Sequence, residues 1–144
     1  MAHDLSLWEA QRVLQEQRLR DCNLLSVKYG LRLTERDIQA LTSARFSSLK
    51  ETGRVEFGEG VLEKLIYAFC DSPYLDQETY AQTLAELQDA FYYFKNETLD
   101  SMTDDDLIAF MKRHFDGDCE GDVGYLTGSL LEDLGRRIRE REDE

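Results

Sequence analysis

The run Val61–Cys70 constrains the fold of this chain more than any other part of the sequence. Only Glu63 and Lys64 carry charge within it. At 3.6 residues per turn, its apolar positions cover most of the helix circumference, which is typical of a central helix packed on more than one side. Pro73 cannot continue the helical hydrogen-bond ladder, so we expect this helix to end before it.

A second helix is expected over residues 77–96, because the apolar residues there follow helical spacing. They recur every three or four positions, at Tyr80, Leu84, Leu87, Phe91 and Phe94. This spacing places them on one face of a helix. The sequence therefore predicts a helix hairpin, formed by residues 59–71 and 77–96, at the centre of an all-α domain.

The first helix is expected to begin at Ser6, because Ser6 and Glu9 have the spacing of a capping box. Its buried face should then carry four apolar side chains, those of Leu7, Ala10, Val13 and Leu14. A weak point in this helix is expected at Cys22–Asn23.

Other helix ends are marked by residues with known capping preferences. Thr34 and Thr103 are suited to begin helices, and Gly30 and Gly53 are suited to end them. The last helix is expected to begin near Thr127. These elements predict an all-α fold, a single-domain orthogonal or irregular bundle of about six helices over residues 1–144.

Composition indicates a protein that folds without disulfides or metal. The chain has 144 residues, of which 42% are hydrophobic and 10% aromatic, enough to bury a core. It contains no apolar run near the ~20 residues that span a bilayer, and its first residues lack the pattern of a secretory signal. Its cysteines, Cys22, Cys70 and Cys119, are odd in number and far apart. We therefore expect a soluble, cytoplasmic protein with no membrane segment.

Charge is distributed unevenly along the chain. Residues 1–55 carry a net charge of +2 and residues 56–144 carry −15, which gives −13 overall. Such a field repels nucleic acids and anionic membranes, and it suits basic partners, metal cations or simple solubility. A helix–turn–helix could form over residues 24–50, but Glu35 and Asp37 stand where DNA contacts would lie. We therefore expect no nucleic-acid binding.

The acidic loop 116–124 has part of the spacing of a calcium-binding loop. Acidic side chains occupy alternate positions, at Asp116, Asp118, Glu120 and Asp122. Calcium loops take ligands from alternate positions, but they also need a glutamate at the twelfth, where this chain has Thr127. These four carboxylates are the candidate metal ligands, and a solvated turn is the simpler interpretation.

Two pairs of residues could line a pocket between the central helices. Glu63 and Tyr67 lie four positions apart, as do Tyr93 and Glu97, so each pair shares a helix face. If the two faces meet, the carboxylates could bind a ligand or a metal, as they do in carboxylate-bridged bundles, although the histidines typical of those bundles are absent.

The aromatic run Phe91–Phe94 leaves two interpretations open. Phe91 and Phe94 belong to the apolar seam, whereas Tyr92 and Tyr93 point to other faces. Tyrosine has an apolar body and a polar tip, which suits either the margin of a core or an interface with a partner.

Three segments resemble an uncharacterised family of bacterial proteins classed as a domain of unknown function. They are Gly53–Gly58, Leu65–Tyr74 and Phe91–Thr98. The similarity covers most of the chain. This resemblance implies a small bacterial cytoplasmic protein, and it brings no activity and no catalytic residues.

The leading functional hypothesis is a non-enzymatic protein-interaction or regulatory module, which binds a protein partner or self-associates. The charge asymmetry and the surplus tyrosines favour this hypothesis. No nucleophile, phosphate-loop or dinucleotide motif occurs in the sequence, so we expect no cofactor. The alternative is a ligand- or metal-binding helical protein, possibly an enzyme, with a pocket between its helices.

Overall fold

The computed structural model describes residues 2–56 and 60–143, with side chains for residues 9–56 and 60–141. The longer helices are α1 (Ala2–Ser26), α2 (Glu35–Thr52), α3 (Val61–Phe69), α4 (Tyr80–Glu97), α5 (Asp104–Asp116) and α7 (Glu132–Asp143). The shorter ones are η1 (Val27–Tyr29), α6 (Val123–Tyr125) and the π-helical η2 (Leu126–Leu131). No β-strand occurs within the described residues. The predicted all-α bundle is therefore confirmed.

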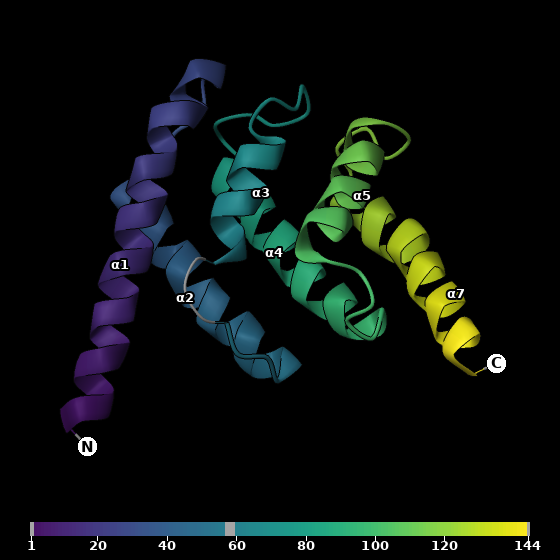
Figure 1. Cartoon of the computed structure of the whole chain (residues 1–144). Helices are drawn as coiled ribbons and strands as arrows, with labels where there is room; N and C mark the ends of the chain where they lie inside the picture. Colours follow the sequence, from purple (N-terminus) through teal and green to yellow (C-terminus); the bar gives the residue numbers. More distant parts are fainter. Residues whose placement is uncertain (1, 57–59, 144) are drawn as a thin grey trace.

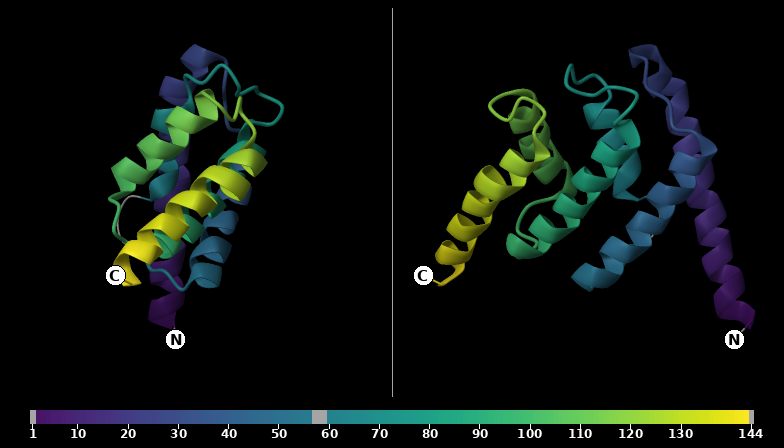
Figure 2. Two further views of the ribbon diagram at one scale, coloured as in Figure 1. Left: turned by 90° about the vertical axis from the view of Figure 1, so that its right-hand side faces the viewer. Right: turned by 180° about the vertical axis from the view of Figure 1, so that it is seen from behind.

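The helices form two layers (Figures 1 and 2). One layer contains α1, α3 and α5, and the other contains α2, α4 and α7. α3 and α4 are the middle helices of their layers. Each contacts both of its neighbours, and the two contact each other. The predicted hairpin therefore lies at the centre of the bundle.

The sequence of α3 explains its central place. Leu62, Leu65, Ile66 and Phe69 are fully buried among the surrounding helices. The helix ends at Phe69, before Pro73, as predicted. Burying a large aliphatic or aromatic side chain stabilises a fold by about 1.5–3 kcal/mol, so this short helix contributes much of the core.

Four of the predicted helix ends are confirmed, those at Thr34, Thr103, Gly30 and Gly53. The Thr34 hydroxyl accepts a hydrogen bond from the Asp37 N–H, and the Asp37 carboxylate accepts one from the Thr34 N–H, which completes a capping box. The Thr103 hydroxyl caps the start of α5 by accepting a hydrogen bond from the Asp106 N–H. Gly30 and Gly53 end η1 and α2 with left-handed backbone conformations.

The start of the first helix differs from the prediction. α1 begins at Ala2, so Ser6 lies inside the helix and does not cap it. The helix also continues without a break through Cys22–Asn23 to Ser26. The predicted burial of Leu7 lies outside the described side chains.

The buried face of α1 also differs from the prediction. Val13 and Leu14 are 57% and 50% exposed, whereas Gln15, Leu19 and Cys22 are buried. Gln15 can occupy an inward position because polar groups of other helices face it. The apolar pattern alone therefore assigned the wrong face.

The last helical segment begins earlier than predicted. Helical structure starts at Val123, not near Thr127, and continues through η2 into α7. The cause is Asp122, whose carboxylate caps the segment by accepting a hydrogen bond from the Tyr125 N–H at 3.1 Å.

Within residues 2–56 and 60–143, the structure has no helix with both the length and the apolar character that spanning a membrane requires.

Candidate functional site

A surface groove lies between α4 and the helical segment that precedes α7. Its volume is about 570 Å³, which falls within the range of small-ligand pockets. The lining residues come from α4, α6, η2 and the start of α7: Glu86, Asp89, Ala90, Tyr93, Phe94, Val123, Gly124, Thr127, Gly128 and Glu132. We refer to this feature as the acidic groove.

One wall of the acidic groove consists of small residues. Gly124, Thr127 and Gly128 line it, while Leu126 and Leu131 are buried in the core. A Cβ atom added at Gly128 would meet no atom within 4 Å, so this wall is open. The wall includes the π-helical stretch η2, a rare conformation that recurs at functional sites.

The charge of the acidic groove is negative. Glu86, Asp89 and Glu132 line it, and no Lys or Arg does among the described residues. Tyr93 is 47% exposed, and the nearby Glu97 carboxylate, partial burial and Glu132 raise the pKa of its hydroxyl. An aromatic surface with carboxylates on its rim favours the approach of a cation.

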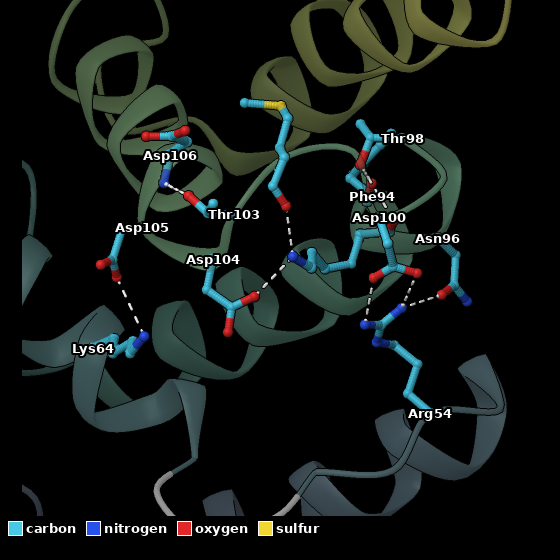
Figure 3. A network of polar contacts seen from close by, with 12 residues as sticks. Arg54, Lys64, Phe94, Asn96, Thr98, Asp100, Thr103, Asp104, Asp105 and Asp106 are labelled. Atoms are coloured by element: carbon cyan, nitrogen blue, oxygen red, sulfur yellow. Dashed lines mark hydrogen bonds and ion pairs between the residues drawn. The ribbon is translucent and has the colours of Figure 1, made fainter. Parts of the chain in front are cut away.

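The acidic turn that joins α4 to α5 differs because three of its carboxylates, those of Asp100, Asp104 and Asp105, have cationic partners (Figure 3). Arg54, which follows α2, donates a hydrogen bond to Asp100 at 2.7 Å. The buried ammonium of Lys95 lies 2.9 Å from Asp104 and donates to the Met102 carbonyl oxygen at 2.6 Å. We refer to residues 100–106 as the paired-acid turn.

The start of α5 continues this pairing. Asp105 lies 3.3 Å from the ammonium of Lys64 on α3, and the Asp106 N–H donates to the Thr103 hydroxyl (Figure 3). The carboxylates at this helix N-terminus also face the positive end of the helix dipole, which stabilises them.

The four residues predicted to line a ligand pocket lie in different surroundings. Glu63 is buried and accepts a hydrogen bond from Gln15 at 2.8 Å. Tyr67 is exposed and lines a separate hollow between α3 and α5. Tyr93 lines the acidic groove, and Glu97 forms an ion pair with Arg139 of α7. The structure therefore does not bring the two pairs together in either of these hollows.

Two of the candidate metal ligands have partners of their own. Asp116 forms an ion pair with Lys112 at 2.6 Å. The imidazole of His114 lies 2.8 Å from Asp118, and this hydrogen bond is the main cause of the lowered pKa of the Asp118 carboxyl.

The other two candidate metal ligands, Asp122 and Glu120, also lie in different surroundings. Asp122 caps the last helical segment, and Glu120 has a left-handed backbone with φ of +48° in an exposed turn. Across the described part of the chain, no three His, Cys, Asp or Glu side chains are grouped so that they could hold a metal ion. The calcium hypothesis stays a prediction, and this arrangement gives it no support.

The structure separates the two tyrosines that the sequence left open. Tyr92 is buried at 1% exposure and belongs to the core, whereas Tyr93 is exposed in the acidic groove. The core interpretation therefore holds for Tyr92, and the interface interpretation remains for Tyr93.

A buried polar network, which the sequence did not reveal, joins both layers. Gln15 of α1 donates to Glu63 of α3 and accepts a hydrogen bond from Arg45 of α2 at 2.9 Å. Arg45 also donates to Glu56 at 2.8 Å, and the Tyr92 hydroxyl of α4 donates to the same carboxylate at 2.7 Å. Burial is the main cause of the raised pKa of Tyr92, and Glu56 raises it further.

Gly60 allows this network to form at the start of α3. A Cβ atom at this position would lie 3.1 Å from Gln15 Oε1 and 3.2 Å from the Arg45 guanidinium. Glycine at this position therefore lets the backbone approach the two polar side chains closely.

The cysteines act as small core residues. Cys22, Cys70 and Cys119 are buried free thiols. Burial raises the pKa of Cys22 to about 11, and it raises the pKa of the other two thiols as well. A thiol with a raised pKa is a weak nucleophile at neutral pH.

The fold and the groove define an all-α protein of two helical layers with an acidic, aromatic groove on its surface. The chain belongs to DUF6323, a family of unknown function whose profile matches residues 18–144. The resemblance to an uncharacterised domain family is therefore confirmed. Neither the curated proteins nor the solved structures contain a match to this chain.

Proposed function

We propose that this protein is a non-enzymatic interaction module and that the acidic groove binds a basic segment of a partner protein. The observation that carries the proposal is the groove itself, in which exposed Tyr93 lies among Glu86, Asp89 and Glu132. Tyrosine is enriched at protein interfaces because it combines a large apolar area with a polar tip.

Charge complementarity selects the kind of partner. A Lys or Arg side chain from the partner would meet carboxylates on the groove rim and the face of Tyr93. Complementary charges raise the rate of encounter and exclude acidic surfaces. A second copy of this acidic chain carries the same net charge of −13, so a basic partner protein is favoured over self-association.

Two properties of the whole chain form part of this proposal. The 144 residues act as one domain, since contacts link the helices of both layers continuously. The protein works in the cytoplasm, as its three separate free thiols suggest.

Ligand binding between helices is the second candidate function. The observation that favours it is the volume of the groove, which would hold a small molecule as well as side chains of a partner. Such a ligand would also be cationic, because the same carboxylates would contact it.

Site-specific photocrosslinking in the cells that produce the protein tests the proposal. A benzophenone amino acid replaces Tyr93 in one variant and Tyr29 in the control, since Tyr29 is 52% exposed on η1 and does not line the groove. We expect one protein adduct from position 93 that weakens as salt is added, and none from position 29. Identical adducts from both positions, or none from position 93, would contradict the proposal.

A further inference from the structure

The ring of Tyr93 is the only aromatic side chain of the acidic groove that is largely exposed among the described residues. The buried ring of Phe94 packs edge to face against it, with the two ring centroids 4.9 Å apart. This contact restricts the rotation of the Tyr93 ring, while the ring itself still lines the groove. A planar aromatic surface is therefore in place before a partner binds.

Carboxylates from two helices accompany this ring. Asp89 precedes Tyr93 by four positions on α4, so the two side chains are neighbours on one helix face. Glu132 belongs to the start of α7, and its negative charge contributes to the raised pKa of the Tyr93 hydroxyl. Both carboxylates line the groove together with the ring, so a cation on the ring would meet acceptors from both helices.

These two carboxylates are free to accept further hydrogen bonds. Asp89 accepts one from the neutral hydroxyl of Ser48, and an ionised carboxylate has about four acceptor sites. Arg136 and Arg139 line the hollow that adjoins the groove, but they pair with other carboxylates of the chain. Neither Asp89 nor Glu132 forms an ion pair in the part of the chain that the structure describes.

Arginine suits both the ring and the carboxylates of this site, whereas lysine suits only the carboxylates. The guanidinium is planar, stacks on aromatic rings and carries five N–H donors in a fixed fork, so it can donate to carboxylates while it lies on the ring. The ammonium of lysine is a compact, strongly hydrated charge without a flat face. It would therefore lose part of its hydration in the groove and gain less contact with the ring.

The wall opposite α4 leaves room for the long side chain of an arginine. Gly124 and Gly128 line this wall, and a Cβ atom added at Gly128 would meet no atom within 4 Å. The aliphatic part of an arginine can therefore lie along the wall while its guanidinium contacts the ring.

We infer that the acidic groove selects arginine over lysine, and that one arginine side chain of the partner stacks on Tyr93 and donates hydrogen bonds to Asp89 and Glu132. This inference rests on the proposed function and adds to it the side chain that the partner presents. The ring provides the selectivity, because the carboxylates alone attract either cation.

NMR titration of the full-length chain with tetra-arginine amide and tetra-lysine amide tests this inference. The two peptides have the same length and charge, so the net charge of the chain favours neither. We expect both to shift the ring signals of Tyr93 and the amide signals of Gly124 and Gly128, and tetra-arginine to bind at least about threefold more tightly. Equal affinity at the groove would overturn the inference and leave the proposed function standing. Failure of both peptides to bind at the groove would overturn the two together.

Substitutions at Tyr93 identify the origin of the preference. Tyr93→Leu removes the ring without changing the charge of the groove, so the two peptides should then bind with equal affinity. Tyr93→Phe keeps the ring and should keep the preference. The matched control Tyr29→Leu removes an exposed tyrosine outside the groove and should leave the preference unchanged. A preference for tetra-arginine that survives in Tyr93→Leu would overturn the inference.

Discussion

The paired-acid turn and the acidic groove are both rich in carboxylates, yet they differ in what faces those carboxylates. In the turn, Arg54 and Lys95 reach Asp100 and Asp104 from other parts of the chain. In the groove, no Lys or Arg lines the described surface. Acidic composition alone therefore does not distinguish the two regions, because the position of the cations decides whether carboxylates stabilise the fold or stay available to a partner.

The largest effect on stability is expected in the paired-acid turn, at Lys95. Lys95→Met leaves the Met102 carbonyl oxygen and the Asp104 carboxylate without the buried ammonium that they share. We expect the free energy of unfolding to fall by about 1–3 kcal/mol, measured by urea denaturation. A loss below about 0.5 kcal/mol would show that this pairing is not structural.

A smaller loss is expected at Arg54. Its guanidinium joins the segment after α2 to the turn after α4, but the Asp100 carboxylate that it meets is largely exposed. Arg54→Met should therefore lower the free energy of unfolding by about 0.5–1 kcal/mol. Added salt should lower the free energy of unfolding of the wild type toward that of the variant. A difference between the two proteins that does not depend on salt would contradict an electrostatic cause.

Removing the charge of two carboxylates in the acidic groove should leave the free energy of unfolding almost unchanged, in contrast to the losses expected in the paired-acid turn. Glu86 and Glu132 are exposed, and no cation lies among the residues that share the groove with them. The double variant Glu86→Gln/Glu132→Gln should change the free energy of unfolding by less than about 0.5 kcal/mol. A large destabilisation would show that these carboxylates serve the fold.

The smallest expected effect is the dependence of stability on pH that comes from Asp100. The hydrogen bond from Arg54 is the main cause that lowers the pKa of Asp100 below its ordinary value of 3.8. The folded protein therefore binds a proton at Asp100 less readily than the unfolded chain does. As a result, the pair stabilises the fold above pH 3.8, and this stabilisation is lost as the pH falls through the lower pKa of the folded protein. Asp100→Asn should cost a few tenths of a kcal/mol at neutral pH and nothing in strong acid. A difference that persists in acid would contradict this cause.

The sequence predicted the parts of the fold that depend on local chemistry or on strong apolar runs. Val61–Phe69 is central because its side chains are mostly apolar and are favourable only where neighbouring helices bury them. Thr34 and Thr103 cap helices through hydrogen bonds to residues three positions further along the chain. These features need only a short window of sequence.

The sequence did not predict features that depend on distant partners. Gln15 is buried because Glu63, 48 positions away, accepts its hydrogen bond. A prediction that places polar residues on the surface therefore assigns the wrong buried face to α1. Tyr93 was a candidate, but the sequence did not indicate that Glu132, which directly follows the π-helical stretch, lines the same groove. A change in helix type leaves no clear sign in the residue pattern.

The most direct measurement compares how two double variants bind the partner that position 93 captures. Glu86→Lys/Glu132→Lys reverses charge inside the groove, and Glu51→Lys/Glu78→Lys makes the same change in net charge at exposed positions outside it. If the acidic groove binds a basic segment, the groove variant should raise the dissociation constant at least about tenfold, while the control stays within about twofold of the wild type. Equal effects of the two variants would contradict a role for the groove, because binding would then depend only on the net charge of the chain.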